Sequence, residues 1–330
     1  MLQGIIIRHM NDLSKDAVNW LAVGEDAQGQ RVDNYLVKIL KGVPKSHIYR
    51  ILRSGEVRVN RRKVGPDARL NTGDQLRIPP IRASAPARKP GAEVMGRVSL
   101  PPTLFEDDAL IALDKPAGLA VHGGSGISFG VIERLRHARP KAPFLELVHR
   151  LDRDTSGVLV VAKKRSALTG LHAQLRDGAI DKRYLALVRG KWRDALRAVE
   201  LSLTSYVTGD GERRVRVDAA GRLARTIFRR VKLWPKADPP LALLEAELET
   251  GRTHQIRVHL THLGFPLAGD EKYGDFAWNK ALARQGLKRM FLHAHRIRFV
   301  HPIDGREVII EAPLAPDLAA FVARLDAADV

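Results

Sequence analysis

The apolar residues of the N-terminal third first follow a helical spacing. Between residues 31 and 40 they recur every three or four positions, which is typical of a helix that packs against a core. Gly42 and Pro44 interrupt this stripe, and Pro44 is suited to begin a second helix. The buried face of that helix is expected to comprise Ile48, Ile51 and Leu52. Two short helices are therefore predicted.

The pattern then changes to the period of two that half-buried strands show. Residues 56–61 alternate and present Arg58 and Arg61, and residues 75–78 alternate after an Asn-Thr-Gly-Asp turn at 71–74. The first part of the chain is thus a compact unit of two helices and small strands.

A proline-rich stretch separates this unit from a larger one. It holds Ala, Ser, Arg and Lys between its prolines, a composition that stays extended and cannot pack a core. We expect a linker at 82–102 between a first domain at 29–81 and a second at 103–330. Residues 1–28 are expected to form a partly disordered N-terminal extension.

The second domain combines strands and helices. Short apolar runs predict buried strands at 110–113, 157–162 and 184–188. Helices are predicted at 166–175 and 253–263, and a last helix at 316–327 is expected to close the fold. A mixed α/β or α+β body is indicated.

The charge of the chain is concentrated near its N-terminus. The 330 residues carry 55 Lys and Arg against 37 Asp and Glu, a net charge of +18. Residues 29–90 contribute +11, whereas residues 1–28 contribute −2 and residues 91–330 contribute +9. A surface charged only for solubility would spread the excess evenly. A small basic module beside a larger body is typical of a domain that docks a polyanion.

The sequence contains no cysteine, which excludes disulfides, thiolate metal sites and cysteine nucleophiles. The longest apolar run near the start, Ile5–Ile7, is too short for a signal peptide or a membrane span. We expect a cytoplasmic protein that does not associate with a membrane.

The densest group of polar residues, His149–Gly157, runs directly into an apolar strand, where active-site side chains often lie. Its His-Arg-Leu-Asp order resembles a kinase catalytic loop, but the other kinase motifs are missing. Asp152 and Asp154 are also candidates for a glycosidase-like acid and base. Alternatively, either carboxylate caps the chain or pairs with a neighbouring arginine, and the residue types alone leave these alternatives open.

The basic module resembles a known RNA-binding domain. The segment RVDNYLVKILKGVPKSHIYRILRSGEVRVNRRKV, followed by NTGDQLRIPP, is similar to an S4 domain. The resemblance implies that the polyanion is RNA, with the second helix and the following strand against phosphates. The side chains expected to contact RNA are Lys45, Arg50, Arg53, Arg58, Arg61, Arg62 and Lys63.

The polar segment also belongs to a set of ordered motifs. HRLDRDTSG, followed by VLVVAKKRSAL, resembles the signature of RluA-type pseudouridine synthases. Further agreement with that family comes from LDKPAGLAVHGGSG, KRYLALVRG, TGRTHQIRVHLTHLGFPLAGD and FLHA. The resemblance extends from about residue 22 to residue 325. It implies an α+β fold: a small S4 domain plus a catalytic domain with a central mixed, mainly antiparallel sheet flanked by helices and loops.

The family resemblance implies an isomerisation of uridine to pseudouridine without a cofactor or a metal. The reaction cuts the N1–C1′ bond, turns the base and rejoins it through C5, with nothing added or lost. The segments are most similar to family members that act on the large subunit. The expected partner is therefore 23S ribosomal RNA, free or in an assembling subunit, modified at several positions by a monomeric enzyme.

The resemblance also assigns roles to single residues. Asp152 matches the catalytic carboxylate, for which attack on the sugar or base and removal of a sugar proton stay open. Arg257 matches the cation that keeps this carboxylate ionised in a water-poor pocket. Tyr184 matches a tyrosine that stacks on the displaced uracil and can assist removal of the C5 proton. Arg150 is expected to fill the space that a flipped nucleotide vacates.

The remaining polar residues are interpreted more simply. His149, His254 and His259 are expected to be structural or to face RNA, and the spacing of His259 and His262 is a weak metal signal. The glycine-rich loop at 122–126 lacks the features of a phosphate-binding loop and is taken as a tight turn near the RNA.

Two other functions compete with this interpretation. A non-catalytic RNA-binding ribosome assembly factor would keep the fold and bind RNA without isomerising it, but the complete set of Asp152, Tyr184 and Arg257 argues against it. A hydrolase of the N-glycosidic bond would release free uracil.

Overall fold

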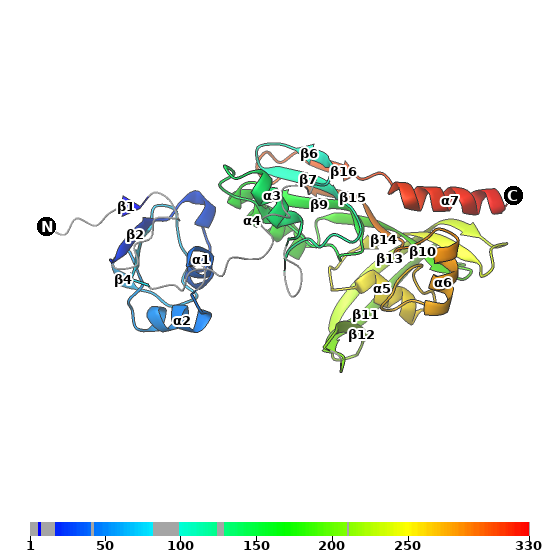
Figure 1. The fold of residues 1–330 in the computed structure, drawn as a ribbon, viewed down its shortest axis with the longest axis horizontal. Coiled ribbons are helices and arrows are strands. Elements are labelled where there is room, and N and C mark those ends of the chain that lie inside the picture. Colours follow the sequence, from blue (N-terminus) through cyan, green and yellow to red (C-terminus); the bar gives the residue numbers. More distant parts are fainter. Residues whose placement is uncertain are drawn as a thin grey trace. The chain divides into compact units, whose positions relative to one another are not determined.

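The chain forms two compact units, Met1–Val98 and Ser99–Val330 (Figure 1). The structure is a computed structural model that describes residues 6–7, 17–40, 43–81, 99–123, 129–209 and 211–329. Most of the predicted linker and residues 124–126 of the glycine-rich loop lie outside these ranges, as does half of the predicted N-terminal extension.

The first unit packs two helices against a small sheet. Its helices are α1 (Val32–Ile39) and α2 (Lys45–Arg53), preceded by the short helix η1 (Glu25–Ala27). The sheet has the order β1-β2-β5-β3-β4. Its strands are β1 (Ile6–Ile7), β2 (Asn19–Ala22), β3 (Arg58–Val59), β4 (Arg62–Lys63) and β5 (Gln75–Ile78). β2 lies within the predicted N-terminal extension, yet it pairs with β5 and so belongs to this sheet.

The predicted helices of this unit are confirmed, since the apolar face of α2 is almost completely buried with α1 in one core. The predicted strand at 56–61 is wrong over most of its length. The strand is limited to Arg58–Val59, because Asn60 and Arg61 take positive φ angles of 49° and 67° and turn the chain into β4. The Asn60 side chain fixes this turn by donating to Asp74 and accepting from the backbone N–H of Gln75, both at 2.8 Å.

The second unit is built on an eleven-stranded sheet with the order β12-β11-β13-β14-β10-β15-β9-β7-β6, in which β16 pairs with β15 and β8 with β9. Among the pairs of the described strands in this sheet, β9 and β15 are parallel and the others are antiparallel. The expected mixed, mainly antiparallel sheet is therefore confirmed. Its strands are β6 (Thr103–Glu106), β7 (Leu110–Lys115), β8 (Glu146–Leu147), β9 (Ser156–Ala162), β10 (Asp181–Arg189), β11 (Leu196–Val207), β12 (Arg213–Val217), β13 (Arg222–Trp234), β14 (Leu241–Leu248), β15 (Leu292–Val300) and β16 (Glu307–Glu311).

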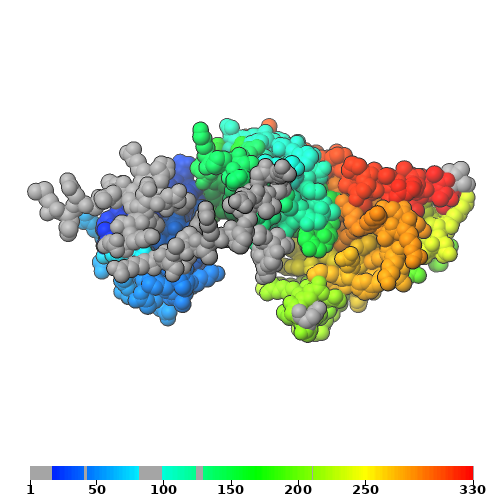
Figure 2. Space-filling model, in the orientation of Figure 1, coloured from blue at the N-terminus to red at the C-terminus, as the bar shows by residue number. Residues whose placement is uncertain are grey.

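Helices cover both faces of this sheet. They are α3 (Val131–Ala138), α4 (Arg165–Arg176), α5 (Gln255–His262), α6 (Phe276–Arg284) and α7 (Pro316–Ala328). α3 and α5 share one core with the sheet, and α4 packs on the opposite face of β9. α6 and α7 enclose a further core, and Figure 2 shows α7 lying along the segment that contains α6. None of the helices in the described parts of the chain is long and apolar enough to cross a membrane.

The central strand β9 is buried on both faces. Leu159 and Val161 enter the core of α3 and α5, whereas Val158 and Val160 enter the core of α4. Gly157, the second residue of this strand, has a φ of +108°, and a Cβ at this position would overlap the carbonyl oxygen of Ala294 on β15. A glycine is therefore required where the two strands meet, at the end of the polar segment that contains Asp152.

Candidate active site

Asp152 lies on the loop that joins β8 to β9. The preceding Leu151 is buried in the core, while 29% of the Asp152 side chain is exposed. The loop is supported from below by Lys115, whose ammonium donates to the carbonyl oxygens of Arg153, Pro116 and Leu119 at 2.8–2.9 Å. Burial lowers the pKa of Lys115 to about 7. The core and this lysine together fix the position of the carboxylate.

Arg257 holds Asp152 and a second carboxylate at the same time. Its Nη1 donates to Oδ2 of Asp152 at 3.0 Å, and its Nε and Nη2 donate to the two oxygens of Asp270 at 2.7 Å each. The Asp270 side chain is completely buried, and that of Arg257 is 6% exposed. The bidentate pair with Asp270 therefore fixes the orientation of the guanidinium, so that Nη1 points toward Asp152.

The pKa shifts of this pair agree with the geometry. Burial alone would raise the pKa of Asp270, but the hydrogen bonds from Arg257 and from the backbone N–H groups of Lys272 and Tyr273 hold it below its usual value. Burial also acts against the charge of Arg257, yet Asp270 and Asp152 outweigh it and raise the pKa of the guanidinium. Arg257 is thus a fixed cation beside the Asp152 carboxylate.

Tyr184 faces the same site from β10. Its two cross-strand partners are alanines, Ala246 on β14 and Ala294 on β15, so small side chains flank the ring. Burial raises the pKa of the Tyr184 phenol, and the charge of Asp152 adds to the effect. The phenol is therefore neutral, and the residue is buried, with 7% of its surface exposed.

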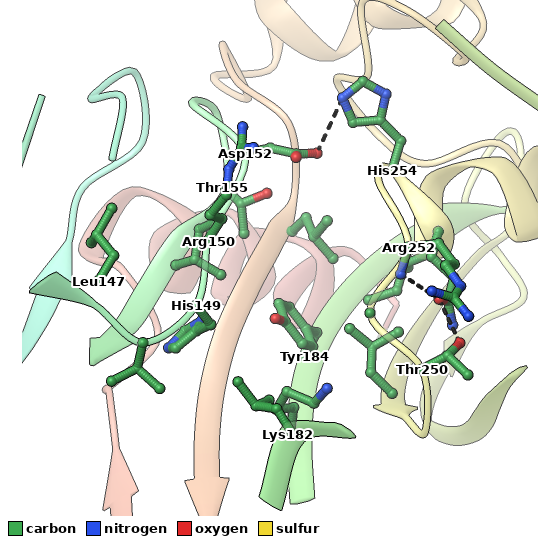
Figure 3. Close-up of a pocket in the computed structure, with 18 of the residues that line it drawn as sticks. Leu147, His149, Arg150, Asp152, Thr155, Lys182, Tyr184, Thr250, Arg252 and His254 are labelled. Atoms are coloured by element: carbon green, nitrogen blue, oxygen red, sulfur yellow. Dashed lines mark hydrogen bonds and ion pairs between the residues drawn. The ribbon is translucent and has the colours of Figure 1, made fainter. Parts of the chain in front are cut away.

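Asp152, Tyr184 and Arg257 line one cavity of about 790 Å³. Its lining also includes Arg150, His149 and Lys182. Figure 3 shows Tyr184 and Lys182 on one side of it and Asp152 and Arg150 on the loop above. A volume of this size is typical of a pocket for a small ligand or a single nucleotide. The four predicted catalytic and base-flipping residues Arg150, Asp152, Tyr184 and Arg257 therefore lie around one cavity.

Lys182 gives this cavity a second cationic group. Burial lowers its pKa, and it makes no hydrogen bond to a described residue. The sequence interpretation quoted Lys182 within a motif but assigned it no role.

Of the histidines that were expected to be structural or to face RNA, His149 is half-buried and His259 is buried. His149 accepts the backbone N–H of Val160 at 3.1 Å, and burial lowers its pKa to about 4. His259 is completely buried, and neither of its ring nitrogens has a hydrogen-bond partner in the described parts of the chain. No group of three His, Asp or Glu side chains that could hold a metal ion is found among the residues that the structure describes.

The basic residues predicted to contact RNA all lie in the first unit. Every one of them is exposed, and none makes an ion pair with a described carboxylate. Arg53 and Arg58 donate instead to the backbone carbonyls of Tyr49 and Gly55. They lie on α2 (Lys45, Arg50, Arg53), on β3 (Arg58), in the turn (Arg61) and on β4 (Arg62, Lys63).

Sequence reasoning missed Asp270, and it gave Tyr273 no role. Both follow α5: Asp270 is the last residue of the motif that contains Arg257, and Tyr273 lies three residues beyond it. The aromatic ring of Tyr273 lies 5.1 Å from the guanidinium carbon of Arg257. A signal for Asp270 exists in principle, because a buried arginine is seldom balanced by one partly exposed carboxylate.

Comparisons with known proteins agree with this geometry. Residues 109–262 match the family described as RNA pseudouridylate synthase, and residues 30–76 match the S4 domain. The first match includes Asp152, Tyr184 and Arg257.

Curated relatives are similar over almost the whole chain. "Ribosomal large subunit pseudouridine synthase C" of Pasteurella multocida is 50% identical over 311 residues, which cover 94% of each chain. The protein of the same name from Escherichia coli is 48% identical over 313 residues, 94% of this chain and 97% of the relative.

Solved structures share the fold. "Human RNA Pseudouridylate Synthase Domain Containing 1" matches with a TM-score of 0.55 and 23% identity over 70% of this chain and 94% of the other. "Human RNA Pseudouridylate Synthase Domain Containing 4" matches with a TM-score of 0.54 and 26% identity over 68% and 92%. With its S4 domain, its catalytic sheet and its relatives at about half identity, this chain belongs to the RNA pseudouridylate synthase family.

Proposed function

We propose that this enzyme isomerises uridine to pseudouridine in 23S ribosomal RNA of the large subunit, at several positions. The observation that carries the proposal is the Asp152 carboxylate, which is paired with Arg257 at 3.0 Å beside Tyr184 and a nucleotide-sized cavity. The names of the curated relatives support the large subunit as the substrate. They also name enzymes, so they give no support to a non-catalytic assembly factor.

Each site residue has a part in this reaction. The N1–C1′ bond breaks with its electron pair moving to the uracil, and C5 then bonds to C1′. The C5 proton is lost and N1 takes up a proton, so the product is an isomer of the substrate. Asp152 acts on the ribose or the base through its carboxylate, and Arg257 orients that carboxylate. Tyr184 stacks on the detached uracil. Arg150, which is exposed on the same loop, fills the space of the flipped nucleotide.

The first unit supplies affinity for the RNA. Its exposed basic side chains on α2, β3, the turn and β4 are suited to phosphate contacts. We further propose that the chain acts as a monomer in the cytoplasm, without a cofactor, a metal or a membrane.

The test is to incubate the protein with large-subunit RNA that lacks the modification and to map pseudouridine. Wild type should form it, and Asp152→Asn should form none. Asp154→Asn is the matched control, because Asp154 lies on the same loop, is exposed, pairs with Arg153 and does not line the cavity. RNA binding without product by wild type would overturn the proposal, and so would release of free uracil.

A further inference from the structure

His254, the residue before α5, has a left-handed backbone conformation. Its φ and ψ angles are 54° and 21°, in the left-handed region that residues other than glycine seldom adopt, with asparagine, aspartate and histidine found there more often than the rest. It occupies the N-cap position of α5, but its side chain makes no capping hydrogen bond. Capping therefore does not explain a histidine at this position, and strain of this kind collects at functional sites.

The strained backbone places the imidazole at the active site. Its Nε2 lies 3.7 Å from Oδ2 of Asp152, as the dashed line in Figure 3 marks. This separation is longer than a hydrogen bond. Catalytic hydrogen bonds are often long in a free enzyme and shorten when substrate fills the site.

The other ring nitrogen fixes the position of the imidazole proton. Nδ1 lies 2.8 Å from the Tyr273 hydroxyl, whose oxygen accepts the backbone N–H of Val215 at 2.9 Å. The hydroxyl has one hydrogen, and no other acceptor for it is found among the described residues. Tyr273 therefore donates to Nδ1, and a neutral His254 carries its proton on Nε2, facing the carboxylate.

Arg257 and His254 both approach the same oxygen of Asp152. Arg257 donates to Oδ2, and Nε2 of His254 faces Oδ2 as well, which leaves Oδ1 without a protein donor in the described structure. We propose that His254 is a positioning residue that, through its Nε2–H, holds Oδ2 of Asp152 together with Arg257 and leaves Oδ1 as the reacting atom. This proposal rests on the proposed function of the site.

Burial keeps the imidazole neutral, because it lowers the pKa of His254 below the usual value. Asp152 and Asp270 favour protonation of the ring, whereas Arg257 and Lys272 oppose it. When substrate shortens the distance between Nε2 and Oδ2, the contact is therefore that of a neutral donor.

The test compares two amides at this position. In His254→Asn the side chain tolerates the left-handed backbone, but its amide overlays Nδ1 and does not reach Asp152. In His254→Gln the longer side chain places an amide donor where Nε2 lies. We expect His254→Asn to lower kcat by about ten- to one hundredfold, the effect of losing a hydrogen bond to a charged group. His254→Gln should recover most of that loss, with KM for the RNA changing little in either variant.

A double-mutant cycle tests the relay through Tyr273. Tyr273→Phe should lower kcat in the wild type and have little further effect in the His254→Asn background, because the proton that Tyr273 fixes is then absent. Thermal unfolding of every variant establishes that it is folded. Wild-type kcat in folded His254→Asn, equal losses in the Asn and Gln variants, or additive effects in the cycle would each overturn the role of His254. If wild type itself forms no pseudouridine, it is the proposed function that fails.

Discussion

Each unit of this molecule contains a buried carboxylate tied to an arginine, and the two pairs serve different ends. In the first unit Asp33 is buried against Arg31, whose side chain is 43% exposed. In the second unit Asp270 is buried against Arg257, whose side chain is 6% exposed and also reaches Asp152. The first pair lies at the start of α1, where Asp33 also accepts from Tyr49 of α2. The second pair orients Arg257 toward Asp152.

The difference shows how one chain uses positive charge in two ways. In the first unit the basic side chains without carboxylate partners lie on the surface, where they are free to meet phosphates. In the second unit the important cation is buried, shared between two carboxylates and unable to move. A buried, paired cation such as Arg257 is therefore suited to orient a carboxylate, whereas exposed cations without carboxylate partners are suited to attract a polyanion.

The largest effect is expected from Arg257→Met. This change leaves the buried carboxylate of Asp270 unpaired, which should lower the free energy of unfolding by about 3–5 kcal/mol. It also frees Asp152, so the single-turnover rate should fall by about a thousandfold or more. Urea unfolding and a single-turnover assay measure the two effects.

A second substitution separates stability from orientation. Arg257→Met combined with Asp270→Asn removes the unpaired charge but keeps an acceptor for the backbone N–H groups of Lys272 and Tyr273. This double variant should regain most of the stability but not the rate. Recovery of the rate in this double variant would show that Arg257 acts only through folding.

Removal of three surface charges in the first unit should weaken RNA binding. Because each lost phosphate contact lowers the slope of log K against log salt by about 0.7–0.9, the Ala variant of three residues should lose about 2–3 from that slope. Affinity at moderate salt should fall by about tenfold or more, with KM rising more than kcat falls. The residues changed are Lys45, Arg53 and Arg58.

The control for this experiment removes the same charge from the second unit. Its substitutions, each to alanine, are Lys280, Arg284 and Lys288, which are exposed on or just after α6. An equal loss of slope in the two triple variants would contradict the assignment of docking to the first unit.

Asp33→Ala should destabilise the first unit selectively. Asp33 accepts from Arg31, from the backbone N–H of Asn34 and from the Tyr49 hydroxyl, so its loss should cost about 1–3 kcal/mol. The hydrogen bond from Arg31 holds the pKa of Asp33 below its usual value. The stabilisation is therefore present above roughly pH 4 and is lost as pH falls through the lowered pKa.

Hydrogen exchange of the α1 and α2 amides measures this effect without averaging over both units. The exposed Asp67→Ala is the control. Faster exchange throughout the second unit would show that the two units unfold together.

The smallest effect is expected from His259→Leu, and it should depend on pH. Burial lowers the pKa of His259 to about 4, so the unfolded chain binds a proton that the folded chain does not over the range between this value and the ordinary one. Stability is therefore lost as pH falls from roughly 6.5 through the lowered pKa. His259→Leu should abolish that loss, so its stability relative to wild type should rise by about 2 kcal/mol between pH 7.5 and pH 5.

Urea unfolding at the two pH values checks this prediction. His262→Leu, on the exposed side of the same helix, is the matched control. An identical pH dependence in wild type and His259→Leu would contradict the account of a buried neutral imidazole.

Much of the fold could be predicted because buried apolar residues recur at the regular spacing of helices or form short continuous runs in strands. The apolar stripes of α1, α2, α5 and α7 identified these helices to within a few residues, and the run at 157–162 identified β9. The long strands β11 and β13 were not predicted. In β13 the buried face includes Ala224 and Thr226, whereas Leu223 and Val231 are exposed, so hydropathy does not alternate cleanly with burial. Many residues of both strands are charged.

The site could be predicted in part for a different reason. Asp152, Tyr184 and Arg257 lie in separate motifs. The order of these motifs along the chain, through its resemblance to a known family, predicted that the three residues share one site, whereas the residues around each of them did not. Asp270 also lies in one of these motifs, but the sequence does not show its role, because that role comes from complete burial against Arg257. The same holds for His254, since a left-handed backbone at a histidine is imposed by the surrounding structure.

The pairing of Asp152 with Arg257 spans 105 residues of chain. During synthesis the ribosome releases the catalytic carboxylate long before it completes α5 and the segment that carries Asp270. A nascent or truncated chain that ends before this point has the loop and the RNA-docking residues but lacks the buried cation. Chains that end before α5 are thus expected to bind RNA without altering it. Modification of a base is expected only from chains whose synthesis has continued past Asp270.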